Sequence, residues 1–176
     1  TVDMSYMFLY DASLTNIDLS GFNTGKAADM SMMFAYCSNL SSLILSGFET
    51  TNVTDMTGMF ASCTKLTNLD LSSFKTINVK SMKSMFQGCN NLTNLDLINF
   101  DTSNVDNMES MFVGCKNLTS LDLSSFDTRN VTNMSAMFNN CTNLSTIYVG
   151  PNWTTDNAYT SNMFDGCGTQ EVTPKS

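Results

Sequence analysis

One spacing governs this sequence, because the same residue types return every 26 positions along its 176 residues. All six cysteines lie on that step, at Cys37, Cys63, Cys89, Cys115, Cys141 and Cys167. Seven phenylalanines follow it from Phe8 to Phe164, and the other five follow it from Phe22 to Phe126. A repeat of roughly 20–50 residues is typical of a solenoid, in which each copy contacts only its neighbours.

The copies divide the chain into one repeat domain, residues 1–170, and a tail, residues 171–176. A partial copy spans residues 1–13, full copies span 14–39, 40–65, 66–91, 92–117 and 118–143, and a degenerate copy spans 144–170. We interpret the last copy as a cap, because Pro151 ends strand pairing and Trp153 offers a large apolar cover. Since the chain begins partway through a repeat, we expect a monomeric fragment of a longer protein.

Each copy contains two shorter periodicities. In the copy that begins at Leu66, the alternation Leu69-Asp70-Leu71 predicts a short strand with one buried face. Helical spacing relates Val79, Met82, Met85, Phe86 and Cys89. That spacing predicts a short amphipathic helix, with Thr76 or Asn78 as its N-terminal cap. The predicted fold class is therefore α/β: a right-handed, leucine-rich-repeat-like solenoid with one short parallel strand and one short helix per copy.

The cysteines, methionines and phenylalanines are predicted to be core residues. Stacked residues of neighbouring coils stand about 4.8 Å apart with parallel side chains, whereas a disulfide needs converging Cβ atoms about 3.8 Å apart. We therefore expect six reduced, buried thiols. A line of single thiols without histidine is a poor metal site, so neither a metal nor a cofactor is predicted.

The outward-facing side of the strands is the candidate binding surface. The residue between the two inward-facing apolar positions is Asp18, Ile44, Asp70, Asp96, Asp122 and Tyr148 in successive copies. We assign binding to the polar strip formed by Asp18, Asn68, Asp70, Asn94, Asp96, Asp122 and Tyr148. The alternatives are a merely solvated face and calcium bridging, although a flat row offers too few oxygen ligands per ion.

A file of threonines also repeats, at Thr24, Thr50, Thr76, Thr102, Thr128 and Thr154. Such polar files usually satisfy backbone groups at a coil corner. The alternative is an ice-binding row, but a single file of threonines argues against it.

Several function classes are excluded. The chain has no histidine, so Ser–His and Cys–His catalysis is impossible, and no glycine-rich phosphate loop is present. We predict no catalytic residues. The net charge of −8 argues against nucleic acid, and the absence of a long apolar run argues against membrane insertion.

The copy 118–143, LTSLDLSSFDTRNVTNMSAMFNNCTN, is similar to the repeats of BspA-like leucine-rich-repeat surface proteins. Those repeats run close to LxxLDLSSFDTSNVTNMSxMFxGCxN. The resemblance covers essentially the whole chain, with Ile44 in place of Asp as one departure. It implies a bacterial protein that is extracellular, at the cell surface or associated with the cell wall. It also implies a non-catalytic module that adheres to a host or microbial surface protein or glycan. The alternative is a structural spacer or stalk that carries another functional domain.

Overall fold

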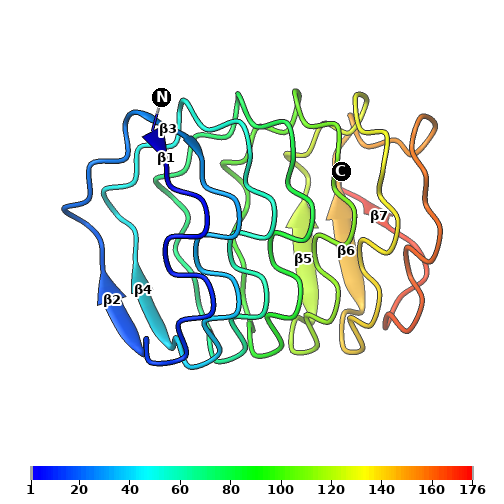
Figure 1. Cartoon of the computed structure of the whole chain (residues 1–176). Coiled ribbons are helices and arrows are strands. Elements are labelled where there is room, and N and C mark those ends of the chain that lie inside the picture. Colours follow the sequence, from blue (N-terminus) through cyan, green and yellow to red (C-terminus); the bar gives the residue numbers. More distant parts are fainter. Residues whose placement is uncertain (1, 176) are drawn as a thin grey trace.

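The chain winds into a row of stacked coils, one for each 26-residue copy (Figure 1). The computed structural model describes residues 2–175; Thr1 of the partial copy and Ser176 of the tail lie outside the described residues. Neighbouring coils pair in parallel and in register, as in Asn16 with Ser42 and Asp18 with Ile44. The predicted stack with short parallel strands is thus confirmed. The prediction of one strand in every copy is wrong, because residues 66–71, which include the segment 69–71, and residues 92–97 form no strand.

Seven short strands form three parallel sheets within the described residues. Along one side of the stack lie β2 (Asn16–Asp18), β4 (Ser42–Ile44), β5 (Ser120–Leu123) and β6 (Thr146–Val149), with β7 (Thr173–Pro174) next to β6 (Figure 1). β1 (Val2–Asp3) pairs with β3 (Ala27–Asp29) on another side. Single parallel bridges continue that second side from Asp29 through Asp55, Ser81, Asn107 and Asn133 to Tyr159.

The helix predicted in each copy is wrong, because residues 2–175 contain no helix. In the copy from Leu66, alternate N–H groups close tight turns on carbonyls three residues earlier, as in Met85 to Met82 (3.2 Å) and Cys89 to Phe86 (3.1 Å). The N–H groups of Met82, Ser84, Phe86 and Gly88 donate instead to the next coil, at Asn107, Glu109, Met111 and Val113. An α-helix would need every N–H for its own i−4 carbonyl. Hydrogen bonds between stacked coils therefore satisfy the backbone N–H groups that a helix would otherwise have satisfied.

Left-handed residues allow this path. Ser84 (φ 55°) and Gly88 (φ 73°) reverse the chain direction at two points in the segment, which a helix cannot do. The residues that share the apolar spacing are nevertheless in the core, because Met82, Met85 and Phe86 face inward and are completely buried.

Neither Thr76 nor Asn78 caps a helix; both bind neighbouring coils. Asn78 Nδ2 donates to the carbonyl of Thr51 (2.7 Å), and the Thr76 hydroxyl bonds to the backbone of Asp101. Five of the six threonines of the file are buried, with 0–1% exposure at Thr24, Thr50, Thr76, Thr102 and Thr128, and Thr154 is partly buried. The interpretation of this file as backbone-satisfying residues is confirmed, and a buried row cannot face ice.

The core is a set of stacked files, as predicted, except that Met7 (42% exposed) and Phe22 (36% exposed) are not buried, which corrects that prediction. Each is the first member of its file, so no preceding residue of the file packs on it. Phenylalanine rings of successive coils lie nearly parallel, with centroids 5.3–5.8 Å apart from Phe8 to Phe164. Five of the free thiols are buried, but Cys167, in the degenerate copy, is only partly buried, which corrects the expectation of six. The Sγ of Cys89 donates to the Phe60 carbonyl (3.1 Å).

Candidate functional site

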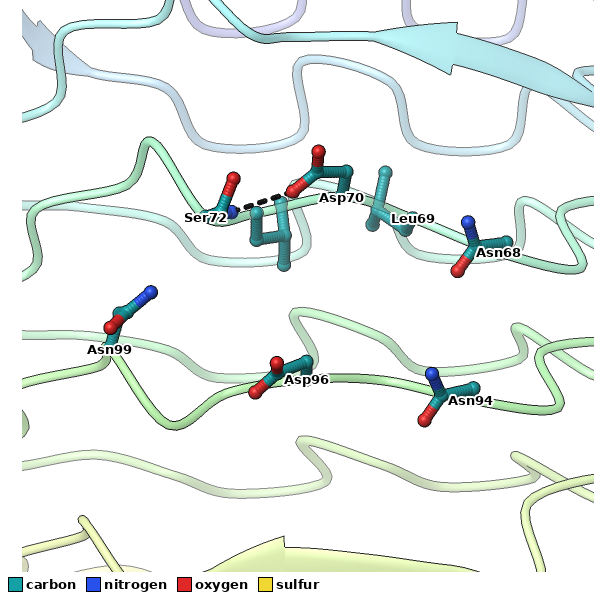
Figure 2. Close-up of a pocket in the computed structure, with 8 residues that line it drawn as sticks. Asn68, Leu69, Asp70, Ser72, Asn94, Asp96 and Asn99 are labelled. Atoms are coloured by element: carbon teal, nitrogen blue, oxygen red, sulfur yellow. Dashed lines mark hydrogen bonds between the residues drawn. The ribbon is translucent and has the colours of Figure 1, made fainter.

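Four of the seven predicted binding residues line one shallow hollow on the strand side of the stack. Asn68 and Asp70 come from the coil of residues 66–91, and Asn94 and Asp96 come from the coil of residues 92–117 (Figure 2). This central hollow has a volume of about 220 Å³, and Leu69, Leu71, Ser72 and Asn99 complete its lining. Asp18 on β2, Asp122 on β5 and Tyr148 on β6 do not line it.

The central hollow lies where the strands separate. β2 pairs with β4, and β5 with β6, but the equivalent segments of the two coils between them form no strands. The N–H of Thr93 still donates to the Thr67 carbonyl (3.2 Å), yet within residues 2–175 no backbone hydrogen bond joins 68–71 to 94–97. Polar backbone groups at this point are therefore available to solvent or to a ligand, beside the four polar side chains.

Each aspartate of the polar strip also holds its own turn. Asp18, Asp70, Asp96 and Asp122 accept the N–H of the residue two positions later, at 2.9–3.0 Å. Figure 2 shows this bond between Asp70 and Ser72. The backbone hydrogen bond lowers the pKa of Asp18 and of Asp70 from the ordinary value. This role was not predicted from the sequence. Aspartate commonly bonds to the backbone two residues on, and three of the four aspartates, all but Asp96, stand in an Asp-x-Ser pattern that favours such a turn.

Asp122 differs from the other aspartates because Lys175 pairs with it. The Lys175 ammonium contacts Asp122 Oδ2, and this hydrogen bond is the main reason that the pKa of Asp122 is lowered. Residues 171–175 of the predicted tail thus reach the polar strip through β7 and Lys175. One predicted binding residue is therefore already occupied by the chain itself.

Exposed apolar side chains lie in and beside the polar strip. Tyr148, a predicted binding residue, is 38% exposed and pairs in register with Asp122. Ile44 is 45% exposed and Ile98 is 49% exposed. A partner that covered the strip would therefore bury apolar surface as well as bond to amides and carboxylates.

The thiols are poor nucleophiles. Burial raises the pKa of Cys89 to about 12 and that of Cys141 to about 12, so both stay protonated at neutral pH. Residues 2–175 contain no group of three or more Cys, Asp or Glu side chains placed to hold a metal ion. No helix in that range is long and apolar enough to cross a membrane.

Comparison with known proteins identifies the repeats. The family described as "Mycoplasma protein of unknown function, DUF285" matches residues 2–99 and, a second time, residues 67–174. No curated protein matches the sequence. The crystal structure of a leucine-rich repeat protein from Bacteroides ovatus ATCC 8483 is similar over 91% of this chain, with 17% sequence identity and a TM-score of 0.45. The chain covers 45% of that protein's length.

Proposed function

Since this chain belongs to the family described as Mycoplasma protein of unknown function, DUF285, we propose that it is a binding module and not an enzyme. Its repeats are of the BspA-like kind. The module is displayed outside the cell, at the cell surface or on the cell wall, where it adheres to a host or microbial surface protein or glycan. The contact surface is the polar strip, with the central hollow as its focus.

The central hollow is the observation that supports this proposal. It combines Asn68, Asp70, Asn94 and Asp96 with backbone groups that no neighbouring strand uses. Amides and carboxylates together both donate and accept hydrogen bonds, which suits the hydroxyl groups of a glycan or the main chain of a peptide. In Asp70 one carboxylate oxygen holds the turn at Ser72, so the side chain is fixed while its second oxygen remains available.

A binding screen of this chain against glycans and surface proteins tests the proposal. For any ligand found, Asn94→Ala and Asp96→Asn should weaken binding by about tenfold together, because each loss of a hydrogen bond costs about 0.5–1.5 kcal/mol. Asn is chosen at Asp96 because its side-chain oxygen can still accept the N–H of Ile98.

Asn23→Ala is the matched control, since Asn23 is exposed but does not line the central hollow. All three variants should unfold at the temperature of the parent protein. If the strip variants bind as tightly as Asn23→Ala, the polar strip is not the contact surface.

A structural spacer is the second candidate, and the coil-to-coil hydrogen bonds favour it. Every coil from the one containing Met4 to the one containing Asn140 donates backbone N–H groups to the next. Such a continuous stack is a stiff rod whose stability depends on contacts between neighbouring coils. A spacer predicts that no screened ligand binds and that activity belongs to a flanking domain.

The location is tested separately. Protease treatment of intact source cells should release peptides of this chain if it is displayed outside, while a cytoplasmic marker stays intact. Protection of the chain until the cells are lysed would overturn the surface location.

A further inference from the structure

A second hollow, of about 430 Å³, lies in the last coil, outside the polar strip. Trp153 and Phe164 contribute aromatic rings to its lining, and Met163 and Val172 contribute aliphatic groups. Asp156 and Glu171 are also among the lining residues, whereas no lysine or arginine is. This C-terminal hollow is formed by the orange-to-red part of the chain in Figure 1.

Hydrogen bonds hold one wall of the C-terminal hollow in place. The two N–H groups of Gln170 Nε2 are shared among three carbonyls, those of Phe164 (3.0 Å), Cys167 (3.3 Å) and Thr169 (3.2 Å). β7 then pairs with β6, and the N–H of Lys175 donates to the Val149 carbonyl (2.8 Å). Glu171 and Val172 lie between these two anchored points, so their backbone is fixed before any ligand arrives.

Trp153, Thr154 and Phe164 are held by contacts within their own coil and with the preceding coil. The N–H of Trp153 donates to the Gly150 carbonyl (3.2 Å), and the N–H of Thr154 donates to the Thr128 hydroxyl (2.7 Å). Phe164 stacks on Phe138 with ring centroids 5.6 Å apart. The two aromatic residues of the hollow are thus held by separate contacts, and Trp153 and Phe164 are both partly buried against the core.

The lining selects for a positively charged, largely apolar group. The face of an indole ring attracts cations, and nearby carboxylates add to that attraction. The chain carries a net charge of −8, and Lys175, the basic residue of the last segment, is already paired with Asp122. Thr154 and Thr155 complete the lining. A primary ammonium is strongly hydrated and would lose that water beside the apolar groups, whereas a quaternary ammonium donates no hydrogen bond and loses little hydration there.

We propose that the C-terminal hollow binds a quaternary ammonium group of the choline type, over Trp153 and Phe164 and beside Asp156 and Glu171. Such a group is present in free small molecules and in lipid headgroups. The site is separate from the polar strip and does not depend on the function proposed for it.

The fluorescence of Trp153 offers a direct test, because the chain has a single tryptophan. Choline should change this fluorescence in a saturable manner. The uncharged isostere 3,3-dimethylbutan-1-ol, which has the same shape, should not do so at equal concentration. Nα-acetyl-lysine amide should bind more weakly than choline. Equal binding of the uncharged isostere, tighter binding of the lysine amide, or no response to choline would each overturn the proposal.

Two isosteric substitutions test the carboxylates. Glu171→Gln and Asp156→Asn should each weaken choline binding by about two- to fivefold, the size expected for the loss of one exposed charge contact. Glu49→Gln is the control, since Glu49 is exposed and does not line the hollow. If all three variants bind choline equally, the carboxylates have no part in the site and the proposal fails.

Vesicles distinguish the two sources of the group. Co-sedimentation of the chain with phosphatidylcholine vesicles, but not with phosphatidylglycerol vesicles, would assign the site to a lipid headgroup. Choline binding without co-sedimentation would assign it to a small molecule. Either result supports the proposed chemistry.

Discussion

The Thr76 hydroxyl holds the peptide backbone of Asp101 at both of its polar groups. It accepts a hydrogen bond from the Asp101 N–H (2.8 Å) and donates one to the Asp101 carbonyl (2.9 Å). Thr50 does the same to Lys75 of the next coil, and Thr102 to Asp127. One buried hydroxyl per coil thus replaces two backbone bonds at the corner, where the coils have no strand pairing.

Replacement of Thr76 by Val removes this hydroxyl without changing the side-chain shape. The N–H and carbonyl of Asp101 then lose their partners in a partly buried corner, so the free energy of unfolding should fall by about 1–3 kcal/mol. Urea unfolding measures the loss, and Thr76→Ser, which keeps the hydroxyl, should recover most of it. The matched control is Thr93→Val, because Thr93 is exposed and makes a single long bond to the Thr67 carbonyl (3.3 Å). A similar loss for Thr76→Val and Thr93→Val would contradict the corner role.

Phe86 should contribute far more stability than Phe8 of the same file. Phe86 is completely buried between Phe60 and Phe112, with ring centroids 5.8 and 5.7 Å away, whereas Phe8 is partly buried and stacks on Phe34 alone. Phe86→Ala should cost about 3–5 kcal/mol, through lost burial and the cavity left behind. Phe8→Ala should cost less than half as much by the same measurement. Equal costs would show that stacking on both faces adds nothing.

The buried thiols should make the fold sensitive to alkaline pH. The ordinary thiol pKa is 9.0, and burial raises the pKa of Cys89 in the folded state to about 12. The unfolded chain therefore releases this proton above pH 9 while the folded chain keeps it, so stability is complete below pH 9 and is lost as the pH rises towards 12. Each such thiol contributes a slope of about 1.4 kcal/mol per pH unit in that window.

Urea unfolding in a reducing buffer at several pH values measures this slope. In Cys89→Ala the free energy of unfolding should fall less steeply with pH than in the parent chain, by about 1.4 kcal/mol per pH unit, which is the contribution of one thiol. The variant should nevertheless be less stable at neutral pH. Rapid reaction of Cys89 with a thiol reagent in the native state would contradict the burial that underlies the effect.

Left-handed turn positions allow a reciprocal test with glycine and alanine. Gly114 has φ 71°, and an added Cβ would meet its nearest neighbour at 3.6 Å, so Gly114→Ala should fit the space but cost about 1–2 kcal/mol of backbone strain. Ala136 has φ 55°, so Ala136→Gly should be neutral or stabilise by up to about 1 kcal/mol. Ala61 is buried without a left-handed backbone, and Ala61→Gly should destabilise. Thermal unfolding of the three variants measures whether each substitution stabilises or destabilises the protein. Destabilisation by Ala136→Gly would contradict the claim that the backbone of Ala136 is strained.

The repeat period and the division into core and surface could be predicted from the sequence. A residue such as Phe86 or Cys89 recurs at the same place in each coil, so its burial follows from its type and spacing alone. The polar strip followed from the alternation around Asp70 for the same reason. Four of its residues do line one hollow, but the sequence did not indicate that the strands would separate there.

The tertiary structure decided where the backbone hydrogen bonds go. The spacing of Met82, Met85 and Phe86 shows which side chains face the core, and a helix and a series of tight turns satisfy that spacing equally well. The choice depends on whether the N–H of Phe86 bonds within its own segment or to Met111 in the next coil. The pairing of Lys175 with Asp122 was equally hidden, since it joins residues 53 positions apart that share no repeat. Local periodicity encodes burial, whereas a backbone partner in another coil exists only once the coils have stacked.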